Sequence, residues 1–163
     1  MPNTEPKFMR VDARMVHGQI VVTFGGTYNV RHILVVDGPV ARDPFMRKFL
    51  SGTKLKGMRV HVLSPQEAWD KWAADDFAYK GGVMIIFPSV KSAHELFALG
   101  FPMRELCVGN QPGGQGRRLI ATNVYLTEDE VALLGEMNDS GVRVYAQVLP
   151  SDPGAEFKDF PKA

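Results

Sequence analysis

The stretch Arg10-Val-Asp-Ala-Arg-Met-Val-His-Gly-Gln-Ile20 carries the chain from a short strand into residues that favour a helix. Over 8–12, Phe8, Arg10 and Asp12 alternate with the apolar residues Met9 and Val11, which is the pattern of a β-strand. In open α/β sheets, ligands bind in the crevice outside the carboxyl ends of the strands. We therefore expect Asp12, Arg14 and His17 to lie on or near a loop at that edge of a sheet.

The rest of the chain alternates between strands and helices. This alternation indicates one domain, an open and mainly parallel sheet with helices on both faces. Ser64 and Thr127 have the spacing of helix-capping boxes. Residues 1–6 contain two prolines and no apolar anchor, so we expect a disordered tail there. The predicted strands are 8–12, 32–37, 58–63, 82–87, 105–109, 124–126 and 142–149, and the predicted helices are 18–28, 41–51, 65–74, 89–99 and 128–139.

Composition places limits on the class of protein. The chain has 163 residues, a formal net charge of +1 and a single cysteine. The near-neutral charge argues against a nucleic-acid binder and gives no support for attraction to an anionic membrane surface. One cysteine excludes an internal disulfide and a multi-cysteine metal site. The single cysteine fits a reducing cytoplasm. The N-terminal residues 1–7 have no apolar core, so we expect no signal peptide there, and no apolar run approaches the length of a bilayer span.

Arg14 and His17 are the candidate functional pair. An arginine can bind two phosphate oxygens at once, and a neutral histidine can act as nucleophile, base or ligand. The free N–H groups at a helix start also favour anions. The combination favours phosphate chemistry. From the residues alone, the alternative is a surface histidine that caps a helix.

The same stretch resembles the active-site loop of IIB components of the mannose/fructose/sorbose-type sugar phosphotransferase system. That loop has approximately the sequence Arg-Ile-Asp-Asp-Arg-Leu-Ile-His-Gly-Gln-Val. The chain departs from the family pattern at Ala13, where the family has a second aspartate, and at Gly25-Gly26, where larger residues are usual. Further matching landmarks, in the same order and spacing, are Val35-Val36-Asp37, Leu106-Cys-Val-Gly109 and Gln147-Val-Leu-Pro-Ser-Asp152.

This resemblance implies a single IIB domain over 1–163, with a mostly parallel sheet of about seven strands. It implies an enzyme, a phosphotransferase, in which His17 is the phosphoryl acceptor. Arg14 carries over as the residue that helps hold the phosphoryl group. Asp12 matches the first aspartate of the family loop, and it would orient Arg14 or fix the tautomer of His17.

The resemblance also implies the partners. The phosphoryl group would come from a phosphorylated IIA component and pass to a sugar imported by the membrane components IIC and IID. The protein would therefore be a cytoplasmic phosphocarrier, peripherally associated with the membrane transporter. We expect no cofactor, no metal and no nucleic acid to take part.

Other residues extend the candidate pocket. The backbone N–H groups of Gly18 and Gln19 would bind phosphoryl oxygens, and Gly18 would let the backbone approach the phosphate without a side chain. Asp37 and Ser89 follow predicted strands, and each either lines the same crevice or serves as a turn or helix-capping residue. The glycine-rich loop 109–116 fits neither a P-loop nor a dinucleotide fingerprint, so we expect a flexible crevice wall.

The remaining titratable residues are expected to be structural. His32, His61 and His94 lie in predicted strands or a helix, and no pair has metal-ligand spacing. Cys107 lies in a predicted strand and is expected to be buried rather than reactive. The distinction matters because, in the phosphotransferase system that the chain resembles, other classes of IIB component carry the phosphoryl group on a cysteine.

A second hypothesis stays open. The same fold could be a non-enzymatic module that binds a small anionic regulatory ligand through Arg14 and His17. Ala13 and Gly25-Gly26 leave room for it. A metal-dependent hydrolase ranks behind both, because the sequence has no cluster of carboxylates and histidines. The identity of the sugar and the oligomeric state, a homodimer included, are left open.

Overall fold

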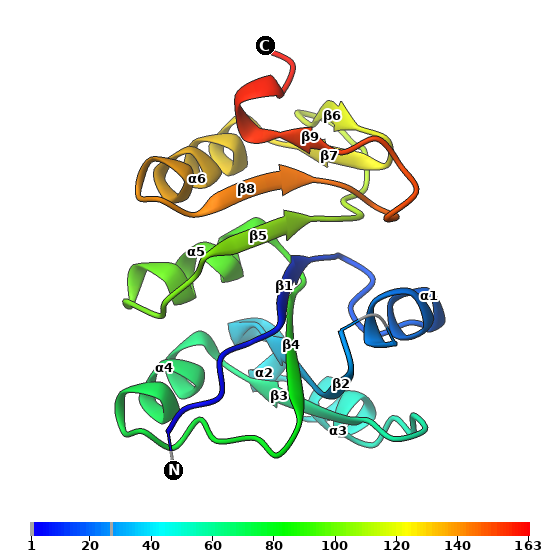
Figure 1. Ribbon diagram of the computed structural model, residues 1–163. Helices are drawn as coiled ribbons and strands as arrows, with labels where there is room; N and C mark the ends of the chain where they lie inside the picture. The colour runs from blue at the N-terminus through cyan, green and yellow to red at the C-terminus, as the bar shows by residue number, and fades with distance from the viewer. Residues whose placement is uncertain (1, 27) are drawn as a thin grey trace.

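A seven-stranded sheet forms the centre of the computed structural model, which describes residues 2–26 and 28–163 (Figure 1). The strand order is β3-β2-β4-β1-β5-β8-β9, with β8 and β9 antiparallel and the other neighbours parallel. This confirms the open, mainly parallel sheet that the sequence predicts. The strands are β1 (Phe8–Val11), β2 (Val30–Val36), β3 (Arg59–Leu63), β4 (Gly82–Phe87), β5 (Glu105–Val108), β8 (Arg143–Ala146) and β9 (Ala155–Glu156).

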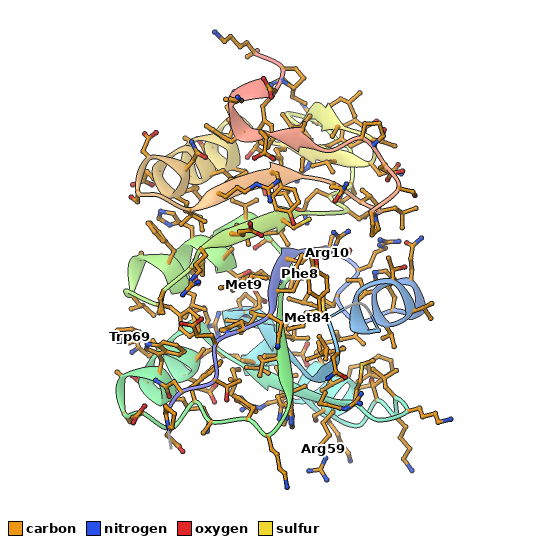
Figure 2. The ribbon with its side chains drawn as sticks, viewed as in Figure 1. Phe8, Met9, Arg10, Arg59, Trp69 and Met84 are labelled. Carbon is orange, nitrogen blue, oxygen red and sulfur yellow. The ribbon has the colours of Figure 1, made fainter. Side chains whose placement is uncertain are left out.

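Helices pack on both faces of this sheet, and each face has its own apolar cluster. Along β1, Met9 belongs to one cluster and Phe8 to the other, where it lies beside Met84 of β4 (Figure 2). Strands buried on both faces explain the continuous apolar runs in the sequence. One face carries α4 (Pro65–Ala73), α5 (Val90–Ala98) and α6 (Glu128–Asp139), and the other carries α1 (Gly18–Ile20), the π-helical turn η1 (Val21–Gly25), α2 (Gly38–Arg42) and α3 (Pro44–Ser51).

The starts of α4 and α6 follow from local sequence. Ser64 and Thr127 each accept a hydrogen bond from the backbone N–H three residues on. The glutamates at those positions, Glu67 and Glu130, accept hydrogen bonds from the capping residues in return. Both predicted capping boxes are therefore confirmed.

The predicted helix over 41–51 is wrong in its extent, because the structure has two helices, α2 and α3, separated at Asp43. Pro44 has no backbone N–H and disfavours helical backbone at the preceding residue. Asp43 accordingly has extended backbone, with φ −90° and ψ 106°. Its carboxylate accepts hydrogen bonds from the N–H groups of Phe45 and Met46 and so caps α3.

The predicted strand over 142–149 also ends early, at Ala146. The carbonyl oxygens of Gln147 and Val148 accept hydrogen bonds from the side chain of Arg10 instead of continuing the strand. The chain then turns back to form β9 and the short 3-10 turn η2 (Phe157–Asp159). The sequence predicted neither β9 nor β6 (Arg118–Ala121), which forms a separate hairpin with β7 (Val124–Leu126).

The N-terminal segments also differ from the sequence pattern. The sequence predicts a disordered tail over 1–6, of which Met1 lies outside the described residues; here Asn3 and Thr4 hydrogen-bond with the backbone of Phe77 and Tyr79. The helix predicted over 18–28 is α-helical only at Gly18–Ile20 and continues as the π-helical turn to Gly25. Of that prediction, Thr27 lies outside the described residues.

Three loops meet at the carboxyl ends of the central strands. Val11 of β1 pairs with Phe87 of β4 on one side and Val108 of β5 on the other. The loops that follow these strands are held together by backbone hydrogen bonds, from Asp12 to Phe87 and from Ala13 to Asn110. This places the loop after β1 at the carboxyl edge of the sheet, as the sequence predicts.

Candidate functional site

A buried carboxylate, that of Asp12, lies at the centre of the site. Oδ1 accepts hydrogen bonds from the backbone N–H of Arg14 (2.9 Å) and from Nε of Arg14 (3.3 Å). Oδ2 accepts from Nε of Arg10 (3.3 Å) and from Nη2 of Arg14 (3.4 Å). Oδ2 also faces Nε2 of His17 at 3.5 Å. The side chain of Asp12 is 0% exposed, so three cationic or titratable groups converge on one desolvated charge.

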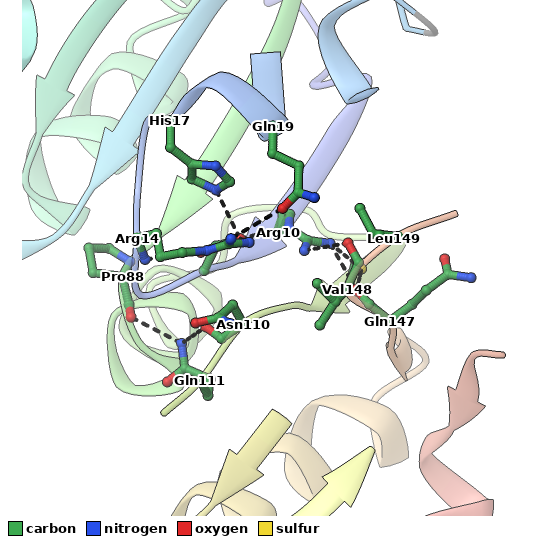
Figure 3. A network of polar contacts seen from close by, with 12 residues as sticks. Arg10, Arg14, His17, Gln19, Pro88, Asn110, Gln111, Gln147, Val148 and Leu149 are labelled. Atoms are coloured by element: carbon green, nitrogen blue, oxygen red, sulfur yellow. Dashed lines mark hydrogen bonds and ion pairs between the residues drawn. The ribbon is translucent and has the colours of Figure 1, made fainter. Parts of the chain in front are cut away.

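Arg10 is the functional residue that the sequence analysis missed. It lies on β1, yet it is fully buried. Its guanidinium donates to the carbonyl oxygens of Gln147 (2.9 Å) and Val148 (2.8 Å), as Figure 3 shows. Nη1 also contacts Sγ of Cys107 at 3.2 Å. A buried cation is costly unless it is paired and hydrogen-bonded, and Arg10 meets both conditions.

Gly109 makes room for the guanidinium of Arg10. Its N–H donates to the carbonyl of Val11 at 2.7 Å, which fixes the backbone beside β1. A β-carbon at position 109 would lie 2.3 Å from Cζ of Arg10. The glycine-rich loop therefore begins with a residue that only glycine can occupy without displacing Arg10.

The same loop is tied down further along. Nε2 of Gln111 donates to the carbonyl oxygens of Pro88 and Asn110. Gln111 is also buried, and its backbone pairs with β7. This part of the predicted flexible wall is therefore held by hydrogen bonds to two neighbouring segments.

Arg14 lies at the surface of the site, with a side chain 38% exposed. Its Nη1 donates to Oε1 of Gln19 at 3.1 Å, and its other contacts are to Asp12. Gln19 thus positions Arg14 through its side chain, a role that the sequence did not indicate. Figure 3 shows Arg14, Gln19 and His17 gathered on one side of the loop.

His17 lies at the start of α1, where its backbone is extended (φ −148°, ψ 163°) and its carbonyl accepts from the N–H of Val21. Its side chain is 20% exposed, and Nε2 is buried facing Asp12. Among the described residues, no hydrogen bond is made by Nδ1. The ring therefore directs one nitrogen at a carboxylate and leaves the other available to a ligand.

The pKa of His17 is lowered from the ordinary value of 6.5. Burial is the main cause, because it disfavours the charged imidazolium. Asp12 acts in the opposite direction, and the positive charges of Arg14 and Arg10 lower the pKa again. The imidazole is consequently neutral at neutral pH, which is the form that can act as a nucleophile.

Gly18 borders open space. A β-carbon at this position would meet no atom within 4 Å. Together with Gln19 it forms the first turn of α1, next to His17. Gly18 and Gln19 therefore lie next to His17, and Gln19 also contacts Arg14.

Asp37 and Ser89 each cap a helix. The carboxylate of Asp37 accepts from the N–H of Val40 at the start of α2, and Ser89 accepts from the N–H of Ser92 at the start of α5. Neither contacts His17 or Arg14 among the described residues. Capping a helix is the role that the sequence offers as the alternative to lining the crevice.

His32, His61 and His94 lie on other elements, and Cys107 contacts Arg10 beneath the loop. Nδ1 of His32 and Nε2 of His61 are 2.9 Å apart on neighbouring strands, and His94 pairs with a carboxylate of α6. No group of three or more metal-ligating side chains occurs in the described part of the chain. Burial raises the pKa of the Cys107 thiol, which keeps it protonated.

Fold and site together define a class: an α/β protein with a neutral histidine and an arginine at the carboxyl edge of a parallel sheet, arranged for an anion. Comparisons with known proteins make this specific. The family model for the sorbose-subfamily IIB component of the PTS system, the sugar phosphotransferase system, matches residues 6–163. The chain belongs to this family, whose members act as phosphotransferases.

Individual relatives agree with the family. The sorbose-specific EIIB component of Lacticaseibacillus casei is 26% identical over 147 residues, covering 90% of this chain and 89% of the relative. The N-acetylgalactosamine-specific IIB component 2 of Escherichia coli is 25% identical over 158 residues, covering 96% and 97%. The mannose-specific EIIAB component of Escherichia coli is 23% identical and matches over 46% of its own length.

Solved structures share the fold. The crystal structure of manxB from Thermoanaerobacter tengcongensis superimposes with a TM-score of 0.85 at 25% identity, covering 95% of this chain and 93% of that one. The sorbose permease IIB domain of Klebsiella pneumoniae gives a TM-score of 0.82 at 22% identity, covering 96% and 95%. In the part of the chain that the structure describes, no helix is long and apolar enough to span a bilayer.

The titration of His17 tests the electrostatics of the site. We expect the His17 C2 proton, followed by NMR, to titrate with a pKa below 6.5. Arg14→Gln should raise this pKa, because a nearby positive charge is removed. Arg104→Gln, a change of the same charge on an exposed arginine paired with Glu5, should leave it unchanged. A wild-type pKa at or above 6.5 would contradict this account of the site.

The contact between Gly109 and Arg10 predicts the effect of one methyl group. Gly109→Ala should lower the free energy of unfolding by roughly 1–3 kcal/mol, the usual cost of overpacking, because Arg10 is held by two carbonyl groups and cannot move aside. Gly114→Ala is the control in the same loop, since its β-carbon would make an ordinary 3.6 Å contact. Urea unfolding of both variants measures the difference in the free energy of unfolding. Equal values would show that the side chain of Arg10 can move aside at little cost.

Proposed function

We propose that the protein is a phosphocarrier of a sugar phosphotransferase system, and that His17 accepts a phosphoryl group from phospho-IIA and transfers it to a sugar. The observation that carries the proposal is the arrangement of His17 between the buried carboxylate of Asp12 and the solvent. A neutral imidazole is suited to attack phosphorus when, as here, Nε2 is buried 3.5 Å from a carboxylate, without a hydrogen-bond partner among the described residues, and Nδ1 is free.

Nδ1 is the attacking nitrogen in this proposal. Nε2 carries the proton and faces Asp12, so the lone pair lies on Nδ1. Nδ1 forms the new bond to phosphorus while the bond from phosphorus to the donor breaks. The phosphorylated ring gains positive charge, and Asp12 stabilises it through Nε2–H. In the second transfer the oxygen of a sugar hydroxyl bonds to phosphorus as the bond to Nδ1 breaks; the ring leaves as neutral imidazole with its proton on Nε2, and the hydroxyl proton passes to water.

Arg14 supplies positive charge where the transition state needs it. In phosphoryl transfer, negative charge is spread over the phosphoryl oxygens, so catalysis depends on positioning and electrostatics. Arg14 is held by Asp12 and Gln19 and still has 38% of its side chain exposed, so it can meet an incoming phosphoryl group. The backbone N–H groups of Gly18 and Gln19 would add donors from the first turn of α1.

The family sets the partners in this proposal. A IIA component would donate the phosphoryl group, and the membrane components IIC and IID would present the sugar. The match with the mannose-specific EIIAB component, whose name joins both functions, supports a IIA donor. The protein would act in the cytoplasm at the transporter. No metal or other cofactor is needed for either transfer step.

The anion-binding module is the second candidate. Ala13, in place of the aspartate usual in the family, is the observation that favours it, because one carboxylate of the loop is missing. The backbone N–H of Ala13 donates to the carbonyl of Asn110, so the loop keeps its shape without an aspartate side chain at position 13. The two candidates differ in whether a covalent bond forms.

Intact-mass measurement distinguishes them. The protein is incubated with phosphoenolpyruvate, Enzyme I, HPr and a matching IIA. We expect one phosphoryl group that is lost in acid, and we expect none on His17→Ala. His94→Ala, which removes a partly buried histidine elsewhere, should be phosphorylated like the wild type. Phosphate that persists on the His17→Ala variant would place the acceptor elsewhere, and no phosphate on wild type with several IIA donors would favour the binding module.

Gly18 tests whether the phosphoryl group approaches the first turn of α1. Gly18→Ala should fold with unchanged stability, because its β-carbon meets no atom within 4 Å. The methyl group would enter the space in front of the N–H groups, so phosphoryl acceptance should slow by roughly tenfold or more, the effect of misplacing a reacting group. Thermal unfolding and the rate of phosphate incorporation are measured side by side. A normal rate would show that the phosphate does not use this turn.

A further inference from the structure

Five exposed cations gather at the amino ends of β2, β3 and β4, the strand ends opposite to those of the histidine site. We call this set, Arg31, Lys54, Lys56, Arg59 and Lys80, the cationic edge. Sheet register places its members together, because His32, next to Arg31, pairs with Arg59 on one side and Val83 on the other. Figure 2 shows Arg59 pointing outward at the lower edge of the molecule.

Close contacts in the loops bring the backbone next to Lys56 and Lys80 beside Arg31. A β-carbon on Gly57, next to Lys56, would lie 3.8 Å from Nη1 of Arg31. A β-carbon on Gly81, next to Lys80, would lie 2.8 Å from Cβ of Arg31. The loop before β3 and the loop before β4 therefore both run alongside the side chain of Arg31.

The cationic edge is not neutralised by neighbouring carboxylates. In the described part of the chain, none of its five members is in an ion pair. Other cations on the surface are paired, as Arg47 is with Glu67, and Arg143 with two glutamates. The edge therefore presents five exposed and unpaired positive charges to solvent; of the two aspartates in the loop that leads to β4, Asp76 is paired with Lys71.

Charge is also unevenly distributed along the chain. Positions 38–62 hold six lysines and arginines and one acidic residue, Asp43, which is engaged in capping α3. Positions 120–163 hold eight acidic residues and three cations. The net charge of +1 conceals this separation. A local attraction to an anionic surface can therefore exist in a chain of near-neutral net charge.

An exposed aromatic pair lies on the helix that leads into this edge. Phe45 and Phe49 on α3 are 72% and 62% exposed, and their rings stack with centroids 6.1 Å apart. Lys48 is exposed on the same helix. The next segment of chain carries Lys54 and Lys56. Exposed apolar rings together with lysines on the same helix and the next segment are a composition found in surfaces that lie in the headgroup region of a bilayer.

We propose that the cationic edge and the aromatic pair dock the protein onto an anionic lipid bilayer. Lysines and arginines would meet the lipid phosphates, and the two phenylalanine rings would enter the headgroup boundary. The five cations come from three segments, 31, 54–59 and 80, and none of them is in an ion pair within the part of the chain that the structure describes. Such a set suits a fluid layer of phosphates, whereas an acidic protein face would require matched geometry. The histidine site lies at the other strand ends, so docking leaves it open.

Vesicle co-sedimentation tests the proposal with the full chain. Vesicles of phosphatidylcholine alone are compared with vesicles that also contain phosphatidylglycerol. We expect binding only to the second kind, and we expect high salt to abolish it. Lys54→Gln, Lys56→Gln and Arg59→Gln together should weaken binding on the order of 100-fold, since each charge near an anionic surface contributes about fivefold.

Two further variants keep the test decisive. A triple variant of Lys91, Lys158 and Lys162 to Gln removes the same charge from exposed positions elsewhere and should bind nearly as the wild type does. Phe45→Ser with Phe49→Ser should also weaken binding. Circular dichroism melting confirms that each variant is folded. Equal weakening by both charge triples would overturn the assignment to this edge.

Failure of the wild type to bind either kind of vesicle would overturn the choice of lipid and make an acidic protein face the occupant to test. The result is independent of phosphoryl transfer. His17→Ala should bind vesicles like the wild type, and the Lys54, Lys56 and Arg59 variant should accept phosphate from IIA in solution. The two proposals can therefore fail separately.

Discussion

The carboxylate of Asp12 is the group on which the site depends. A buried, unpaired carboxylate would cost several kcal/mol, so its position requires Arg10 and Arg14 to be in place. In turn, each arginine is oriented by its bonds to Asp12. Because these three groups satisfy one another, the loop after β1 has few alternative arrangements. The ring of His17 is then set against a fixed charge rather than against a mobile side chain.

Opposite edges of the same sheet differ in how their charges are arranged. The carboxyl ends hold a small, shielded cluster in which every charge has a partner. The amino ends of β2, β3 and β4 carry charges that are exposed and unpaired among the described residues. A parallel sheet permits this separation, since all of its loops of one kind meet at one edge. A surface contact at one end therefore need not disturb the other.

Much of the fold could be predicted from sequence, because buried parallel strands such as β4 are continuous apolar runs. The candidate site was predicted where it is local: Asp12, Arg14 and His17 lie within one loop, and their resemblance to a family loop assigns them roles. Arg10 could not be recognised in this way, because its partners Gln147 and Val148 are more than a hundred residues distant in sequence. β9 is too short, at two residues, to show a period.

The bonds from Arg10 to the segment after β8 have a consequence for biosynthesis. They join residues separated by 137 and 138 positions, nearly the whole length of the chain. A nascent polypeptide emerging from the ribosome can form β1 and its loop early, but the guanidinium lacks these two acceptors until the last strands are made. The loop that holds His17 is therefore fully supported only when the polypeptide is complete. A chain that ended early would contain Asp12, Arg14 and His17 but would lack the two carbonyl groups that hold Arg10.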